Sequence, residues 1–214
     1  ISQMNLITKF KSLPGVTKAR LYGSLASKKA DSYSDIDIEI TSNDPRATTS
    51  NLLSLLNNIG ELYVVLPIAI TRTERVYTIL WKHLPLYQKL DLKILFTSNF
   101  SINKYAIAYD EKFRLFHDFF IGAIRYTKYR MRQMHWASFK FYRSAIDQWL
   151  KLKMNNCTLD SFVKMDKINK WIYPSKPQDM DKIMLEIAVD FRKAYKNNKF
   201  GEGVVEFMHA ELKA

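Results

Sequence analysis

The chain has 214 residues, of which 47% are hydrophobic and 14% aromatic, and its formal net charge at pH 7 is +12. This many apolar side chains can build a core, so the composition excludes an intrinsically disordered chain. A single cysteine, Cys157, excludes an intrachain disulfide, and we expect an ordinary thiol in a reducing compartment. The positive charge favours anionic partners such as nucleotides, nucleic acid or phosphate groups, although a lysine-rich surface that keeps the chain soluble explains it equally well.

The sequence offers no segment suited to crossing a bilayer, which takes about 20 apolar residues. The longest apolar run, Leu62–Ile70, is interrupted by Pro67. The first residues lack the charged start and apolar middle of a signal peptide. We therefore expect a soluble cytoplasmic protein with no membrane partner.

Residues 1–100 predict the element order αβαβαβββ, which is a mixed sheet with helices packed on it. The first helix ends at Pro14-Gly15. Asp44 followed by Pro45 predicts the start of the third helix, because aspartate caps free amides and proline fits the first turn. The predicted elements are a helix over 2–13, a strand over 16–22, a short helix from Leu25 to Lys29, a strand over 34–40, a helix over 45–60, and strands over 61–70, 75–82 and 88–96.

The second half of the chain has helical spacing almost throughout, which predicts a helical bundle. We place the domain boundary near residue 100, with an α/β (α+β) domain over 1–100 and an all-α domain over 101–214. The charge divides unevenly, with net +4 before this boundary and net +8 after it. The side chains expected in the helical core are Phe113, Phe116, Phe120, Ile121 and Ile124 in one helix and Trp136, Phe139, Ala145, Trp149 and Leu152 in the next, before a last long helix over 175–195.

Acidic residues alternate with isoleucines in the segment SDIDIEI, residues 34–40. Because successive side chains of a strand point to opposite faces, Asp35, Asp37 and Glu39 share one face. Carboxylates this close repel one another unless a cation compensates them, and Mg²⁺ prefers such hard oxygen ligands. The solvated polar face of an amphipathic strand fits these three residues equally well.

A further acid, Asp91, lies alone among apolar residues in the predicted strand QKLDLKILF. Its neighbours Leu90 and Leu92 have the character of buried residues. They favour a metal ligand on a strand beside Asp37, which would complete the carboxylate set. The alternative is an acid that faces solvent on an edge strand.

The pair Gly23-Ser24 ends one predicted strand and opens a helix. Backbone amides and a hydroxyl at such a position bind anions, and glycine lets a phosphate approach the backbone closely. A phosphate site shortly before an acid pair is the combination that binds a nucleoside triphosphate through Mg²⁺. Lys28 and Lys29 could reach the triphosphate, although ordinary solvated lysines explain each of them better.

The stretch YGSLASKKADSYSDIDIEI, together with QKLDLKIL, resembles the signature of the DNA polymerase β-type nucleotidyltransferase superfamily over residues 16–96. The resemblance implies that Asp35, Asp37 and Asp91 hold two Mg²⁺ ions and carry catalysis. It implies that the Gly-Ser pair binds the triphosphate. The implied reaction moves a nucleoside monophosphate, AMP from ATP, to a hydroxyl group and releases pyrophosphate.

Within that superfamily the chain resembles the aminoglycoside 6-adenylyltransferase-like and lincosamide nucleotidyltransferases, enzymes of antibiotic resistance. These place a helical domain after the catalytic one, and residues 116–150 are similar to their substrate-side helices. The resemblance assigns Asp118 the place of a general base, whereas a simple pairing with Arg114 is the alternative. A helical half of net charge +8 argues against a polycationic aminoglycoside.

Three functions remain open from the sequence. The first is transfer to a hydroxyl of a small molecule, the second is transfer to RNA or protein, which fits the net charge, and the third is nucleotide binding without catalysis. Aromatic residues interleave with Lys and Arg over residues 126–144, a pattern that can stack bases. We prefer an aromatic core stripe there. A monomer and a homodimer both fit the sequence.

Overall fold

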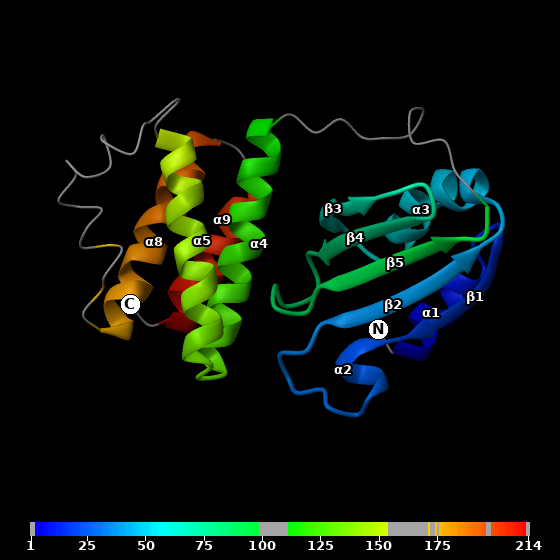
Figure 1. Ribbon diagram of the computed structural model, residues 1–214, viewed down its shortest axis with the longest axis horizontal. Coiled ribbons are helices and arrows are strands. Elements are labelled where there is room, and N and C mark those ends of the chain that lie inside the picture. The colour runs from blue at the N-terminus through cyan, green and yellow to red at the C-terminus, as the bar shows by residue number, and fades with distance from the viewer. Residues whose placement is uncertain are drawn as a thin grey trace. The chain divides into compact units, whose positions relative to one another are not determined.

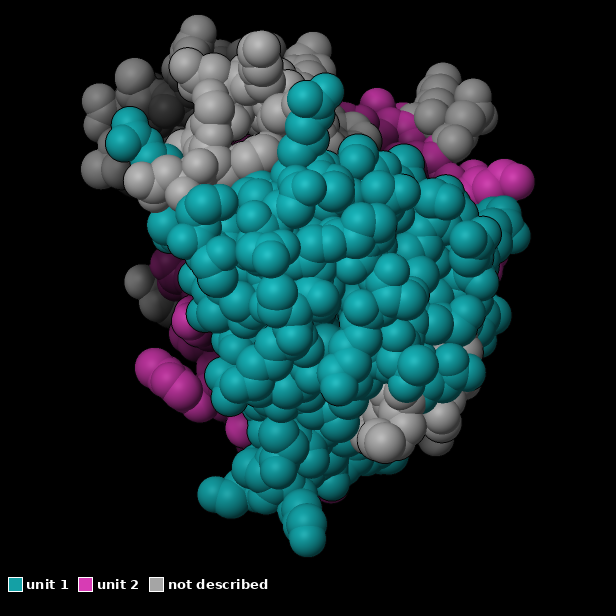
Figure 2. Space-filling view, turned by 90° about the vertical axis from the view of Figure 1, so that its right-hand side faces the viewer, with its two compact units in different colours: residues 1–108 teal, residues 109–214 magenta. Residues whose placement is uncertain are grey.

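The computed structural model describes residues 3–98, 111–153, 171, 174, 176–195 and 198–212. Its internal contacts divide the chain into two compact units, Ile1–Ala108 and Tyr109–Ala214, which Figure 2 distinguishes by colour. The predicted boundary near residue 100 and the single cysteine, Cys157, both lie outside the described residues. The exact boundary and the state of this thiol therefore stay predictions.

The first unit has the predicted order αβαβαβββ and a five-stranded mixed sheet (Figure 1). The strands lie in the order β1-β2-β5-β4-β3, in which β2 and β5 are parallel and the other neighbours antiparallel. Asp44 caps α3 as expected, because its carboxylate accepts the amide of Ala47 at 2.9 Å. The elements are α1 (Gln3–Lys11), β1 (Val16–Leu21), α2 (Gly23–Ala26), β2 (Ile36–Ser42), α3 (Pro45–Ile59), β3 (Leu62–Ile70), β4 (Glu74–Trp81) and β5 (Leu90–Phe96).

The hydrophobic core of this unit lies between one face of the sheet and the helices α1 and α3. Alternation along β2 and β5 sends Ile38, Ile40, Leu90 and Leu92 into that core, where each is 0% exposed. The residues between them must therefore point to the second face of the sheet. This alternation places the acidic side chains of both strands on that second face.

The short helix α2 differs from its prediction. It spans Gly23–Ala26 and not Leu25 to Lys29. The hydroxyl of Ser27 donates to the carbonyl of Gly23 at 3.0 Å, and Lys28 has a left-handed φ of 57°. A left-handed residue cannot continue a right-handed helix, so α2 ends after one turn.

The second unit is helical, as predicted. Its described helices are α4 (Glu111–Met131), α5 (His135–Lys153), α8 (Pro177–Ala194) and α9 (Lys199–Leu212). The predicted stripe on α4 is buried at Phe116, Phe120, Ile121 and Ile124, while the side chain of Phe113 lies outside the described residues. None of the described helices is long and apolar enough to span a membrane.

Trp136 contradicts its predicted place in the helical core, because it is 84% exposed. The buried stripe of α5 contains Tyr142, Ala145, Ile146 and Trp149. At about 100° per residue, the six residues from Trp136 to Tyr142 turn the helix by about 600°, so Trp136 lies about 120° around the helix from Tyr142 and outside that stripe.

His117 is a buried titratable group in the core of the helical unit, 3% exposed and stacked on Phe200 with ring centroids 5.7 Å apart. Burial lowers its pKa from 6.5 to about 4. The unfolded chain therefore binds this proton at higher pH than the folded chain, so stability falls as the pH drops from about 6.5 towards 4.

We expect the free energy of unfolding to decrease by up to about 3 kcal/mol across this pH window because of His117. A His117→Leu variant should lose that part of the pH dependence, whereas His209→Gln, at an exposed position, should keep it. Urea unfolding of the helical signal between pH 7 and 4 measures both. Identical pH profiles for wild type and His117→Leu would rule this explanation out.

Candidate active site

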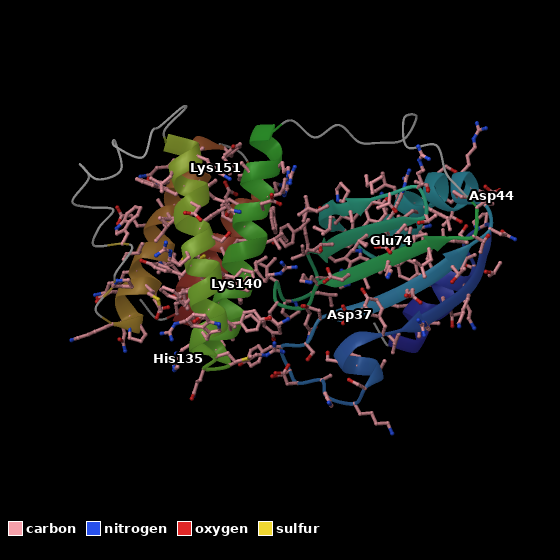
Figure 3. The ribbon with its side chains drawn as sticks, viewed as in Figure 1. Asp37, Asp44, Glu74, His135, Lys140 and Lys151 are labelled. Atoms are coloured by element: carbon pink, nitrogen blue, oxygen red, sulfur yellow. The ribbon has the colours of Figure 1, made fainter. Side chains whose placement is uncertain are left out.

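Polar side chains of neighbouring strands meet on the second face of the sheet. Arg20 on β1 lies opposite Glu39 on β2, and its Nη2 is 2.6 Å from the Glu39 carboxylate. Asp37 on β2 lies opposite Asp91 on β5. Thr78 on β4 donates its hydroxyl to Asp91 at 2.6 Å. A row of charged and hydroxyl groups therefore crosses four strands, and Figure 3 marks Asp37 and Glu74 on this sheet.

Asp37 and Asp91 are brought together by the parallel pairing of β2 and β5. Their Cα atoms are direct partners in the register of the two strands, so both side chains leave the sheet on the same face. β5 is the middle strand of the sheet, and the Asp91 side chain is 21% exposed. The alternative of a solvated acid on an edge strand is therefore wrong.

Gly23 lies directly against Asp37. Its φ is +69°, and a Cβ at this position would lie 2.2 Å from Oδ2 of Asp37. The amide of Tyr22 donates to the carbonyl of Asp37 at 3.0 Å, which fixes the chain before α2 to β2. Only glycine fits both the left-handed backbone and the space. The Gly-Ser turn and the acid pair thus form one local structure.

Lys89 was not among the predicted site residues. Its side chain is 3% exposed, and its ammonium forms ion pairs with Asp35, at 3.2 Å, and with Asp91. The backbone carbonyl of Lys89 accepts the amide of Ile36 at 2.9 Å. Lys89 precedes Asp91 by two positions, so strand alternation places both side chains on one face and could have drawn attention to it.

Tyr22, the residue before the Gly-Ser turn, lies near the acid cluster. Burial, and next the negative charges of Asp37, Asp91, Glu39 and Glu74, raise the pKa of the Tyr22 hydroxyl to about 12. A phenol surrounded in this way stays protonated at neutral pH and can donate a hydrogen bond.

The carboxylates of Asp35, Asp37 and Asp91 have the donor chemistry that magnesium prefers. A cationic group, the Lys89 ammonium, already binds two of them, so the cluster accepts a positive charge. Across the described residues, however, no three side chains of His, Cys, Asp or Glu are grouped so that they could hold a metal ion. The predicted metal role of the three acids therefore stays a prediction.

The remaining predicted site residues lie in different surroundings. Ser24 follows Gly23 in the single turn of α2, and Lys28 and Lys29 are exposed just after it. Asp118 belongs to the helical unit, where its 49% exposed carboxylate lies 3.6 Å from Arg114 one turn earlier. This pairing is the alternative that the sequence offered for Asp118, and its role as a general base stays a prediction.

The first unit is an α+β domain with a carboxylate cluster on one face of its sheet. Its element order, its mixed sheet and the acid pair beside a Gly-Ser turn define this class. A family model described as nucleotidyltransferase domain matches residues 3–113. This match covers more than half of the 214 residues, and the chain belongs to the nucleotidyltransferase domain family. No curated protein matches the chain.

Proposed function

We propose that the protein is a Mg²⁺-dependent nucleotidyltransferase that moves AMP from ATP to a hydroxyl group of a small molecule. The observation that carries the proposal is the pairing of Asp37 and Asp91 across two parallel strands, with Gly23 against Asp37. Two facing carboxylates beside a glycine turn suit the binding of a metal-bound triphosphate better than a purely structural role.

In the proposed reaction the acceptor hydroxyl oxygen attacks the α-phosphorus of ATP. A new phosphorus–oxygen bond forms, the bond from the α-phosphorus to the bridging oxygen breaks, and pyrophosphate leaves. Asp35, Asp37 and Asp91 would hold magnesium, which when bound lowers the pKa of the hydroxyl and neutralises charge on the phosphates. Asp91 would accept the hydroxyl proton, and the backbone at Gly23 and Ser24 would bind the triphosphate.

The choice of a small molecule as the acceptor rests on the family resemblance alone. The helical unit resembles the substrate-side domain of aminoglycoside and lincosamide enzymes, which supports an antibiotic-like alcohol as the acceptor. RNA is the second candidate, and the exposed Trp136 on a helix that also exposes Lys140 and Arg143 favours it. Figure 3 marks Lys140 and Lys151 on this helix, α5.

A transfer assay tests the proposal directly. The protein is incubated with Mg²⁺ and ATP or GTP labelled at the α-phosphate, and with aminoglycosides, lincosamides, tRNA or bulk protein as acceptors. We expect the label on one class of acceptor, and no label when Asp37 is replaced by asparagine. Omission of Mg²⁺ should abolish transfer as well.

The salt dependence of the same assay separates the acceptors. Binding to RNA through several phosphates weakens steeply as the salt concentration rises, whereas a small neutral alcohol is affected far less. Label on no acceptor, in a protein that does bind ATP with Mg²⁺, would contradict the catalytic proposal. It would favour a nucleotide-binding module without transfer.

A further inference from the structure

Lys89 is a buried cation in the middle of the acid cluster. It is 3% exposed, whereas its partners Asp35 and Asp91 are 24% and 21% exposed. A buried ammonium needs negative partners, because leaving water is unfavourable for an uncompensated charge. The backbone of Lys89 is held beside Asp35, since its carbonyl accepts the amide of Ile36, the residue after Asp35.

The charge balance of the cluster follows from these contacts. Asp35 and Asp91 would otherwise stand beside Asp37 and Glu39 on one face of the sheet, with Arg20 paired to Glu39. Lys89 supplies the positive charge at the place where the sequence predicts a metal ion. Among the described residues the aspartates form no group of three that could hold a metal ion.

We propose that Lys89 is the resident counter-ion of the acid site, holding Asp35 and Asp91 in place without metal and competing with a divalent cation for them. The inference rests on the proposed function in taking Asp35, Asp37 and Asp91 as the metal ligands. Lys89 is thus a positioning residue, and it sets how tightly the site takes up metal. It is not a group that touches the transferred phosphate.

The test uses Mn²⁺ as the probe, with its free concentration followed by electron paramagnetic resonance, and thermal unfolding as a second readout. Lys89→Met removes the charge and keeps the length of the side chain. We expect its Mn²⁺ dissociation constant to fall about tenfold, which means tighter binding, because the variant lacks the positive charge that competes with the metal for the carboxylates. Without metal its melting temperature should fall by about 5 °C, since the acids lose their partner.

Lys93→Met is the matched control. Lys93 lies two residues further along the same strand and on the same face, and its ammonium is 3.4 Å from Glu74. It pairs with neither Asp35 nor Asp91 in this structure, and we expect its Mn²⁺ affinity to stay within about twofold of wild type. If Lys89→Met does not fold alone, the double variant Lys89→Met/Asp91→Asn should restore folding, because charge and partner leave together.

The outcomes separate this inference from the proposed function. Equal Mn²⁺ affinity of wild type and Lys89→Met would overturn the inference and leave the proposed function standing. If Lys89→Met binds Mn²⁺ and wild type does not, Lys89 excludes the metal completely. This result would support the inference and contradict a metal-dependent reaction of the wild-type protein. Binding by neither protein at millimolar Mn²⁺ would overturn the inference and the metal dependence of the proposed function together. A double variant that still fails to fold would overturn the inference alone.

Discussion

An Asp37→Asn variant is expected to keep the fold and lose nucleotide transfer by at least about 10³-fold, which corresponds to about 4 kcal/mol in the reaction barrier. Asp37 lies opposite Asp91 and against Gly23, so it is the carboxylate that joins the acid pair to the glycine turn. Asparagine has nearly the same shape but lacks the charge that a metal-bound triphosphate requires.

The stability of the same variant should be equal to that of wild type or slightly higher. Asp37 shares its face with Asp91 and Glu39, and removing one of several clustered negative charges relieves their repulsion. Thermal unfolding without metal measures this. A variant that loses activity only because it unfolds would point to a structural role for Asp37.

Glu39→Gln provides the matched control for this experiment. Glu39 lies two residues further along β2 on the same face, but its carboxylate pairs with Arg20. The pair is partly exposed, so its loss should change stability by less than about 1 kcal/mol and leave transfer within a few-fold of wild type. Equal loss of activity in both variants would mean that net charge on this face, and not the position of Asp37, determines the rate.

The strands of the sheet and the acid pair could be predicted from the sequence, because the alternation of buried and exposed side chains is visible within each short segment. Ile38 and Ile40 alternate with Asp37 and Glu39, and the same rule places Asp91 among buried neighbours on β5. The predicted metal role of Asp91 also placed its strand beside that of Asp37, and β2 does pair with β5. These features depend on short stretches of chain, each of which carries its own signal.

Alternation places Lys89 on the face of Asp91, but it does not predict the burial of Lys89, which depends on Asp35 from a distant part of the chain as well. Its own segment shows only a lysine near a strand start, which is normally a solvated residue. This lysine is buried because the parallel pairing of β2 with β5 brings Asp35 beside it. Trp136 is the opposite case, since an aromatic residue in a helical pattern is normally buried, and only the phase of the whole helix places it outside.

Replacing Gly23 by alanine is expected to reduce transfer by about 10²-fold or more, because misplacing a reactive group by about 1 Å has effects of this size. The added Cβ would lie 2.2 Å from Oδ2 of Asp37, so either the carboxylate or the turn must move. The left-handed φ of +69° adds about 1–2 kcal/mol of backbone strain for any residue with a side chain.

Gly15→Ala separates strain from site geometry. Gly15 has a φ of +81°, and its added Cβ would lie 2.7 Å from Cβ of Asp44 at the start of α3. This glycine precedes β1, and Asp44 follows β2, so the clash occurs at the other end of these strands from Asp37. Both variants should therefore lose about 1–3 kcal/mol of stability.

Only Gly23→Ala should lose activity when transfer is measured per folded molecule at a temperature where both variants are folded. Chemical unfolding gives the stability, and transfer of the α-phosphate label gives the rate. If Gly23→Ala is destabilised like Gly15→Ala but remains fully active, Gly23 is needed only for the left-handed backbone conformation. Selective loss of transfer would mean that the absence of a side chain at Gly23 keeps the Asp37 carboxylate in place.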